Sequence, residues 1–257
     1  MGTDSIRHQK RLAAPLSYPI ARKPYKYTFH GDAGAHGIKE GNSIPLGIIM
    51  RESLSFAKTK RDLKFILSKR QVFVDGKPKS SPRWMVGPND VLSLPSIDEY
   101  YRLIPWVGRR KIKLVPIEKK DSTWKLCVIA NKRNLRGGDL QLNLDDGRNI
   151  RIKKGDKDYD KYNTKGTLKL EIPSQKILDY YPFELNSPVL IIRGTNTGLS
   201  GKLSYIEKRI GKNRSIAIVE STEGGEKIIT AMENLIIVGK DSIEIPVFDA
   251  SKEKEEN

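Results

Sequence analysis

Residues 106–240 consist of short runs of apolar and β-branched residues separated by turn-forming residues. In the first part the runs cover residues 112–117, 124–130, 139–144 and 167–172. Between them, segments 136–139 and 145–148 contain Gly and Asp, which favour tight turns. Short strands at this regular spacing are typical of small β units. Residues 106–185 are therefore predicted to form a small β barrel or sandwich.

The same pattern continues through residues 186–240. Runs at 189–193, 200–206, 215–220, 227–231 and 235–238 give about five strands joined by Gly-rich turns. An SH3-like barrel has five short strands, so this segment is predicted to adopt that fold. No repeat of solenoid length occurs along the chain.

Residues 43–105 combine helical and strand patterns. A first amphipathic helix is predicted to start near Pro45, which the first turn of a helix tolerates, and to run to about Ala57. Thr59 is expected to cap a second helix, because Asp62 follows it at the spacing of a capping box. Strands are predicted to follow at residues 72–74, 91–94 and 100–104.

The second predicted helix has two distinct faces. A step of about 100° per residue places Leu63, Ile66 and Leu67 on one side. The basic side chains of Lys60, Arg61 and Lys64 fall on an adjacent arc. One face is therefore expected to pack on a core and the other to face a polyanion.

Residues 1–42 lack a regular apolar period. They contain three prolines and a Gly-rich stretch, and basic residues alternate with aromatic ones from Arg22 to His30. Such a segment buries little surface by itself and is expected to become ordered on binding. Cations attract phosphates, and the rings of Tyr25, Tyr27 and Phe29 offer faces on which unpaired bases stack.

The net charge of +16 indicates a polyanionic partner, with nucleic acid ahead of an anionic membrane surface. The excess is local: residues 5–28 carry six basic and no acidic residues, and residues 43–83 carry ten against three. Residues 102–133 carry ten against two, whereas residues 241–257 carry two against six. The positive field is thus expected in the first half of the chain and an acidic tail at the end.

Catalytic and metal-binding patterns are missing from the sequence. The chain has three histidines, and the possible ligand set of His30, Asp32 and His36 lies in the Gly-rich stretch without a cysteine partner. No P-loop, nucleophile elbow or dinucleotide fingerprint occurs. The chain is therefore predicted to hold no metal and no cofactor, and not to be an enzyme.

The single cysteine, Cys127, lies between apolar residues and is expected to be buried and unreactive. One cysteine forms no internal disulfide and fits a reducing compartment. The pair Asp145-Asp146 precedes Gly147 and is interpreted as a hairpin turn. No apolar stretch approaches the roughly 20 residues needed to cross a bilayer, so no membrane association is predicted.

A series of short motifs extends along most of the chain. They include RHQKRLAAP at residues 7–15, VFVDGK at 72–77, VGPNDV at 86–91, RGTNTG at 193–198 and NLIIVGK at 234–240. Together with residues 43–57, 125–127 and 146–150, their order and spacing resemble the archaeal and eukaryotic small-subunit ribosomal proteins usually called S-four-e. The chain departs from the family at Thr195, where a second Gly is common, and at residues 32–36, where Pro-Gly-Pro-His is common.

The resemblance implies an α+β, multidomain protein in which three modules follow a basic arm. They are a small α/β RNA-binding domain of the S-four type, a central β domain and a C-terminal SH3-like KOW β barrel. The expected parts are residues 1–42 for the basic N-terminal arm, 43–105, 106–185 and 186–240 for these modules, and 241–257 for the acidic tail.

The family also implies a function. The expected protein is a structural constituent of the small ribosomal subunit that binds 16S-type ribosomal RNA (rRNA), with other small-subunit proteins as neighbours in the cytoplasm. We expect RNA contacts from Arg7, His8, Lys10, Arg11, Arg22, Lys23, Tyr25, Lys26, Arg51, Lys58, Lys60, Arg61, Lys64, Lys69, Arg70, Lys77, Arg193, Asn196 and Lys202.

Two other classes of protein use the same modules. An RNA-modifying enzyme, such as a pseudouridine synthase, carries an S-four module for targeting, but the residues after position 105 show no polar catalytic cluster. A DNA-binding or transcription factor carries a KOW barrel, and tight competition by duplex DNA would favour that alternative.

Overall fold

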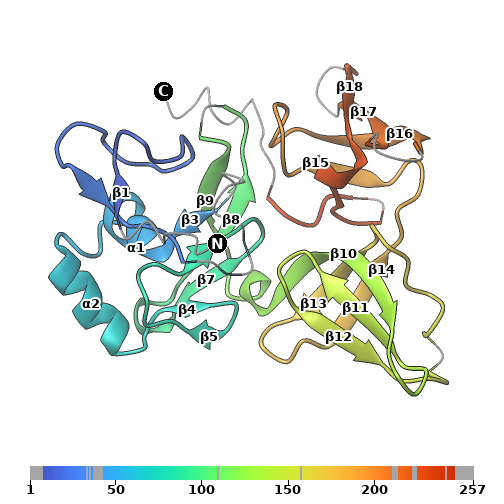
Figure 1. Cartoon of the computed structure of the whole chain (residues 1–257), viewed down its shortest axis with the longest axis horizontal. Coiled ribbons are helices and arrows are strands. Elements are labelled where there is room, and N and C mark those ends of the chain that lie inside the picture. The colour runs from blue at the N-terminus through green and yellow to red at the C-terminus, as the bar shows by residue number, and fades with distance from the viewer. Residues whose placement is uncertain are drawn as a thin grey trace, which may run out of the picture.

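The structure is a computed structural model of the whole chain. It describes residues 8–32, 34, 36, 43–108, 110–156, 158–209, 214–221, 225–240 and 242–246. Three five-stranded antiparallel sheets dominate it, with two small two-stranded sheets beside them. Figure 1 shows the first sheet and the N-terminal segment on the left, the central sheet at the lower right and the C-terminal sheet at the upper right. Within the described residues the chain is mostly β with few helices.

The first sheet has the strand order β5-β4-β7-β8-β9, and all its pairs are antiparallel. The turn after β4 has left-handed backbone at Asp75 and Gly76, as its Asp-Gly sequence predicts. A small sheet pairs β3 with β6. The strands are β3 (Ile44–Pro45), β4 (Phe73–Val74), β5 (Lys77–Pro78), β6 (Met85–Val86), β7 (Val91–Leu94), β8 (Glu99–Pro105) and β9 (Ile112–Pro116).

The first predicted helix is shorter than expected. A single turn, α1 (Leu46–Ile48), continues into the π-helical segment η2 (Ile49–Ser53). The helix does not reach Ala57, because Ser55 takes left-handed backbone with a φ of 57°. The chain then turns away, and Ala57 packs into the core.

Helix α2 (Lys60–Ser68) confirms the predicted capping box. The Asp62 amide donates to Thr59 Oγ1 at 3.1 Å, and the Thr59 amide donates back to Asp62 Oδ2 at 3.0 Å. Leu63 and Leu67 are fully buried, whereas the basic residues of the helix, Lys60, Arg61 and Lys64, are exposed. The apolar face thus packs on the core as the sequence predicts.

The N-terminal segment is ordered from His8 to Asp32, contrary to the expectation that it would be poorly structured by itself. Strands β1 (Gln9–Lys10) and β2 (Tyr27–Thr28) pair antiparallel. Four side chains of the segment, at Ala14, Tyr18, Ile20 and Phe29, join one buried cluster with Leu46, Leu63, Val74 and Leu103. Its apolar residues are irregularly spaced, so no period in the sequence shows that they share a core with the following residues.

The central sheet has the order β12-β11-β10-β13-β14. Its long strand β10 alternates between two cores, because successive side chains of a strand point to opposite faces. Cys127 and Ile129 belong to the core of this sheet, whereas Leu126 and Val128 belong to the C-terminal core. The strands are β10 (Trp124–Asn134), β11 (Leu140–Leu144), β12 (Asn149–Ile152), β13 (Thr167–Glu171) and β14 (Ile177–Tyr181).

The C-terminal sheet has the order β18-β17-β16-β15-β19, so the first and last strands of this segment pair. All five lie within two residues of the predicted runs, and the closed barrel stays a prediction. The strands are β15 (Pro188–Ile191), β16 (Ser200–Glu207), β17 (Ile216–Ser221), β18 (Lys227–Ala231) and β19 (Leu235–Ile237).

The acidic tail, to which we assign no contact from sequence, touches the fold at Glu244. Its carboxylate accepts a hydrogen bond from the Tyr181 hydroxyl at 2.6 Å and pairs with Lys169 at 2.5 Å. Ile245 is buried in the C-terminal core. Of the tail, Asp241 and residues 247–257 lie outside the described residues.

Candidate RNA-binding surface

Six of the predicted RNA-binding residues lie together on and around α2. The helix has nine residues, and its solvent side carries cations because only Leu63 and Leu67 are fully buried. Lys69 lies 4.4 Å from the centre of the exposed Phe65 ring, so the last turn also presents an aromatic face. We call this set the basic α2 surface: the exposed side chains of Lys58, Lys60, Arg61, Lys64, Lys69 and Arg70.

The N-terminal segment places further predicted residues beside α2. Figure 1 shows β1 and the adjoining loops next to the start of α2. His8, Lys10, Lys23, Tyr25 and Lys26 are all exposed there. Arg7 lies outside the described residues.

A groove of about 770 Å³ separates this segment from the start of α2. We call it the arm groove. It combines tyrosine rings, lysine side chains and one carboxylate. Its lining residues are Arg11, Tyr25, Lys26, Tyr27, Arg51, Glu52, Ser55, Ala57, Lys58 and Thr59.

Two predicted RNA-binding arginines instead hold the N-terminal segment in place. Arg11 is only 3% exposed, and its guanidinium donates to the Tyr27 and Ala21 carbonyls and to Glu52. Arg22 donates to the carbonyls of Arg11, Ala14 and Pro15. These donors are used inside the protein, so both side chains order the segment.

Arg51 and Phe29 also have internal partners. Arg51 pairs with Glu52 at 2.7 Å, and its guanidinium lies 4.8 Å from the centre of the Phe29 ring. Phe29 is buried in the core, so its ring is not available to stack on a base as the sequence suggested.

The remaining predicted residues lie away from α2. Lys77 is exposed on β5, at the edge of the first sheet, and Lys202 is exposed on β16. Arg193 and Asn196 are half-buried in and beside the loop before β16. The exposed predicted residues therefore form one large group around α2 and the N-terminal segment. The others lie at the edge of the first sheet and in the C-terminal sheet with its adjoining loop.

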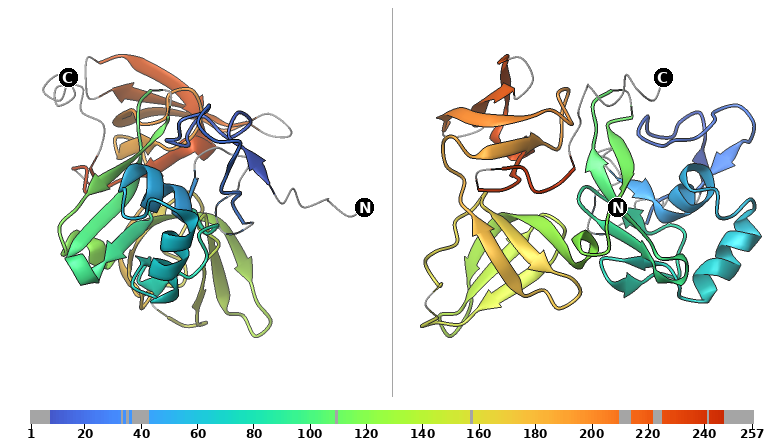
Figure 2. Two further views of the ribbon diagram at one scale, coloured as in Figure 1. Left: turned by 90° about the vertical axis from the view of Figure 1, so that its left-hand side faces the viewer. Right: turned by 180° about the vertical axis from the view of Figure 1, so that it is seen from behind.

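The loop at residues 194–198 packs against the β8–β9 hairpin. Lys111 Nζ donates to the Gly194 carbonyl at 2.5 Å, and Thr197 Oγ1 donates to the same carbonyl at 2.7 Å. Gly198 has a φ of +96°, and a Cβ there would lie 2.4 Å from the Trp106 carbonyl carbon. Figure 1 and the right-hand view of Figure 2 show the hairpin between the N-terminal part and the C-terminal sheet.

A buried cluster of opposite charges connects the first sheet to the central sheet. The Lys125 ammonium lies 2.5 Å from Asp90 Oδ1 and 3.0 Å from Asp75 Oδ2. It also lies 3.1 Å from Asp146 Oδ2. Arg148 pairs with Asp75 at 2.6 Å and with Asp146 at 3.1 Å. We call these five side chains the ion cluster.

Sequence reasoning missed this cluster because its members lie up to 73 positions apart. It also corrects the expected role of the basic block at residues 102–133. Lys125 and Arg102 are almost completely buried, and Arg102 donates to the carbonyls of Asp121 and Trp124. The partners of these two cations lie inside the protein, so neither side chain belongs to the exposed basic surface.

The surroundings of the ion cluster shift several pKa values. Burial would raise the pKa of Asp90, but the neighbouring His36 and Lys125 hold it well below its usual value. Burial raises the pKa of Asp75. Burial, together with the adjacent charge of Asp146, raises the pKa of Asp145 to about 6. The pKa values of Asp75 and Asp90, two carboxyl groups of the ion cluster, are thus shifted in opposite directions, and that of the adjacent Asp145 is raised.

Cys127 is fully buried, as predicted, and burial raises the pKa of its thiol well above the usual value. Its Sγ lies 3.4 Å from Asp146 Oδ2. The Cys127 Sγ and one carboxylate oxygen each of Asp145 and Asp146, all atoms of the kind that bind metal ions, lie within 4.8 Å of one another. The ammonium of Lys125 already supplies positive charge at Asp146, and the two aspartates form the predicted hairpin turn.

Of the three residues considered for a metal site, His30 and Asp32 contact Arg83, whereas His36 has a different partner. Arg83 pairs with Asp32 at 2.9 Å and donates to the His30 carbonyl at 3.2 Å. His36 instead contacts Asp90 at 3.0 Å. Burial lowers the pKa of His36, but Asp90 outweighs this effect and raises it overall.

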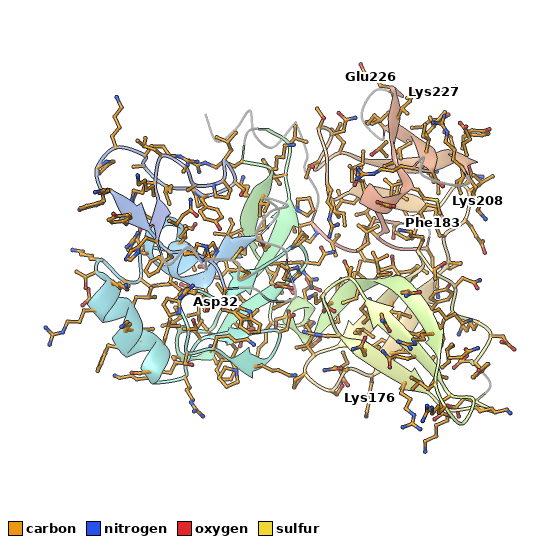
Figure 3. The ribbon with its side chains drawn as sticks, in the orientation of Figure 1. Asp32, Lys176, Phe183, Lys208, Glu226 and Lys227 are labelled. Atoms are coloured by element: carbon orange, nitrogen blue, oxygen red, sulfur yellow. The ribbon has the colours of Figure 1, made fainter. Side chains whose placement is uncertain are left out.

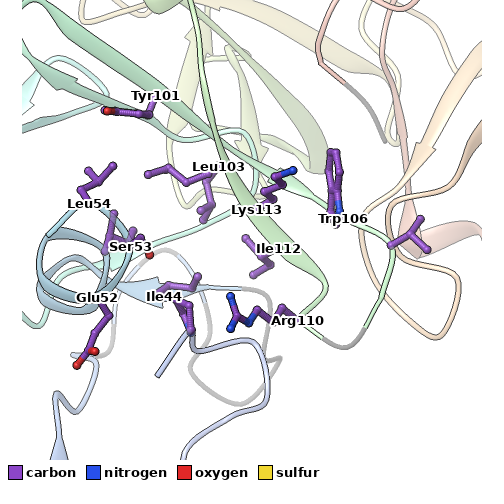
Figure 4. Close-up of a pocket in the computed structure, with 14 residues that line it drawn as sticks. Ile44, Glu52, Ser53, Leu54, Tyr101, Leu103, Trp106, Arg110, Ile112 and Lys113 are labelled. Atoms are coloured by element: carbon purple, nitrogen blue, oxygen red, sulfur yellow. The ribbon is translucent and has the colours of Figure 1, made fainter. Parts of the chain in front are cut away.

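A second groove, of about 600 Å³, lies between η2 and the β8–β9 hairpin (Figure 4). Its walls are mainly aliphatic, with Ile44, Leu54, Leu103 and Ile112 among them. Glu52 borders both grooves, so η2 forms the ridge between them.

Comparison with known proteins gives the family. A profile described as "Ribosomal family S4e" matches residues 97–177, and one for the "RS4NT (NUC023) domain" matches residues 5–39. A protein of Staphylothermus marinus named "Small ribosomal subunit protein eS4" is 38% identical over 91% of this chain and 93% of its own length. The chain belongs to the ribosomal S4e family.

Other relatives agree with this membership. A protein with the same name from Methanocaldococcus jannaschii is 40% identical over 91% of this chain and 94% of its own length. The crystal structure of the 30S ribosomal protein S4e from Thermoplasma acidophilum is 24% identical, with a TM-score of 0.63. The match covers 79% of this chain and 97% of the Thermoplasma acidophilum chain. This structural similarity shows that the two proteins share a fold.

Membership confirms the resemblance found in the sequence motifs. The S4e family consists of structural ribosomal proteins and not enzymes, so the chain has a structural ribosomal role. The alternative of an RNA-modifying enzyme is thereby excluded. Among the described residues, no helix has the length and apolar character that crossing a membrane requires.

Proposed function

We propose that this protein is a constituent of the small ribosomal subunit that binds 16S-type rRNA through the basic α2 surface and the exposed residues of the N-terminal segment. In this role it supports subunit assembly and translation on cytoplasmic ribosomes. Its other partners are neighbouring small-subunit proteins. The names of its relatives and the distribution of exposed charge support this proposal.

The observation that carries the proposal is the placement of exposed cations on one side of the first domain. Six of them surround α2, and Lys10, Lys23 and Lys26 stand on the adjoining N-terminal segment. Each cation that contacts a phosphate releases counterions, so such a surface binds RNA with an affinity that falls steeply with salt.

The expected recognition is mainly of RNA shape. Lysine and arginine side chains contact phosphates, and phosphate contacts position a protein without reading sequence. Lys77, Arg193, Asn196 and Lys202 offer further contacts from the edge of the first sheet and from the C-terminal sheet. The partition into an arm, an S-four-type domain, a central β domain, a KOW barrel and a tail remains our prediction for how these contacts are organised.

A charge-reversal experiment tests the proposal. Lys60→Glu combined with Lys64→Glu should weaken small-subunit rRNA binding at least tenfold in a filter-binding titration, and should lower the slope of log affinity against log salt by about two. The matched control reverses two exposed lysines, Lys227 in β18 and Lys208 directly after β16. These side chains lie at the far upper right of the molecule in Figure 3, away from α2.

The proposal fails if both double variants lose rRNA affinity equally, or if neither loses any. A second arm of the experiment adds duplex DNA as competitor at physiological salt. Displacement of rRNA by equimolar duplex DNA would instead support a DNA-binding protein. Stoichiometric recovery of the wild-type protein in salt-washed small subunits is the expected result for a constituent.

A further inference from the structure

The arm groove exposes two aromatic side chains that the protein core does not use. Tyr25 is 70% exposed and Tyr27 is 45% exposed. Large rings turned toward water are typical of binding surfaces, because they bring apolar area and a polar hydroxyl at little conformational cost. Both tyrosines line the groove.

Cations accompany both rings. The Arg11 guanidinium lies 5.2 Å from the centre of the Tyr25 ring, and Lys26 Nζ lies 5.4 Å from that of Tyr27. The His8 ring is 5.3 Å from the Tyr27 ring and tilted by 50°. The two tyrosines thus have positive charge next to their rings.

The floor of the groove is also positive. Arg11 and Arg51 share a single carboxylate, Glu52, and each pairs with it at 2.7 Å. Two guanidinium groups against one carboxylate leave an excess of one positive charge. Lys26 and Lys58 add exposed ammonium groups at the rim.

The groove is held in one shape before any ligand arrives. Arg11 anchors the segment that carries Tyr25 and Tyr27, and β1 pairs with β2 beside them. On the opposite wall, the capping box fixes Thr59 at the start of α2. A preformed site avoids the cost of ordering its side chains on binding.

We propose that the arm groove binds an unpaired nucleotide of rRNA, with its base stacked on Tyr25 or Tyr27 and its phosphates held by Lys26 and Lys58. The proposal rests on the proposed function and deepens it, since it names the form of RNA that this site takes. Paired bases hide their faces inside the helix, so exposed rings select single-stranded RNA. The volume of the groove lies in the range of small-ligand sites.

The test compares single-stranded with double-stranded RNA on the full-length protein. The probes are a fluorescein-labelled, unpaired RNA of about ten nucleotides and a blunt RNA duplex of the same length. Tyr25→Ala with Tyr27→Ala should weaken binding of the single strand about tenfold or more and leave duplex binding within twofold. Tyr25→Phe with Tyr27→Phe should retain single-strand binding, because phenylalanine keeps the stacking face.

The control is Tyr205→Ala, which removes an exposed ring of the C-terminal sheet and should change neither affinity. Equal losses for single strand and duplex, or no loss for the alanine pair, would overturn the proposal. An acidic peptide that binds the wild type but not the alanine pair, while RNA affinity stays unchanged, would assign the groove to a protein partner and would also overturn it.

Failure here is distinguishable from failure of the proposed function. If Lys60→Glu with Lys64→Glu weakens rRNA binding but the tyrosine variants do not affect the single strand, only the groove proposal fails. If the wild type shows no preference for rRNA over duplex DNA, the proposed function fails.

Discussion

Arg11 Nη2 lies 2.7 Å from Glu52 Oε1, and this ion pair ties the N-terminal segment to η2. The two residues are 41 positions apart, and Arg11 also donates to two carbonyls of its own segment. One buried guanidinium therefore fixes both the path of the segment and one wall of the arm groove. The basic residues of that segment owe their position beside α2 to this contact.

Removal of this ion pair should destabilise the protein. Arg11→Met leaves Glu52 with Arg51 alone and two backbone carbonyls without their donor, so we expect a loss of about 3 kcal/mol in the free energy of unfolding. Urea unfolding measures this loss, and limited proteolysis should show faster cleavage before residue 32. The control, Lys161→Ala, removes an exposed pair with Asp158 and should cost less than about 0.5 kcal/mol. An Arg11→Met variant as stable as the control would contradict this account.

The ion cluster gives a second prediction. Lys125→Met leaves Asp75 and Asp146 with Arg148, and Asp90 with His36, as their remaining basic partners, and an uncompensated buried charge costs about 3 to 5 kcal/mol. Cys127, which lies 3.4 Å from Asp146 and is inert when buried, should then react faster with a thiol reagent. The exposed Lys227→Met serves as control. Unchanged thiol reactivity together with an unchanged urea midpoint would show that the cluster does not hold the two sheets together.

The pKa of Asp145 predicts a pH dependence. Burial and Asp146 raise it from 3.8 to about 6, so between about pH 4 and pH 6 the folded protein keeps a proton that the unfolded chain releases. The contribution of Asp145 to the free energy of unfolding therefore falls as pH rises through this range. Asp145→Asn keeps an acceptor for the Val128 amide and removes the titration. The free energy of unfolding of the variant, minus that of the wild type, should therefore increase by on the order of 2 kcal/mol between pH 4 and pH 7. A flat difference curve from urea titrations would be inconsistent with the raised pKa.

Local patterns predicted most of the regular structure. The alternation of buried and exposed residues in β11 and β17, and the capping box at Thr59, are properties of adjacent residues. The positions of α2 and of most strands after residue 90 were therefore accessible from the sequence, although β12 and β14 fall outside the predicted runs. The family resemblance was confirmed by comparison.

Contacts between distant residues could not be predicted in this way. The order of the N-terminal segment depends on Arg11 meeting Glu52, and the ion cluster depends on Asp75 and Asp90 meeting Lys125. No local period records such pairings. The sequence consequently counted Arg11 and Arg22 as RNA contacts, although their donors bind the protein's own backbone.

The most direct test of the central claim is cleavage of rRNA from a probe attached to α2. Cys127 is buried, so Lys64→Cys provides a single accessible thiol for an iron chelate that generates hydroxyl radicals. In reconstituted small subunits, the probe at position 64 should cut rRNA strongly at a few sites, whereas a probe at Lys227→Cys should cut weakly or elsewhere. Absence of cleavage from position 64 in subunits that contain the protein would contradict the claim that the basic α2 surface faces rRNA.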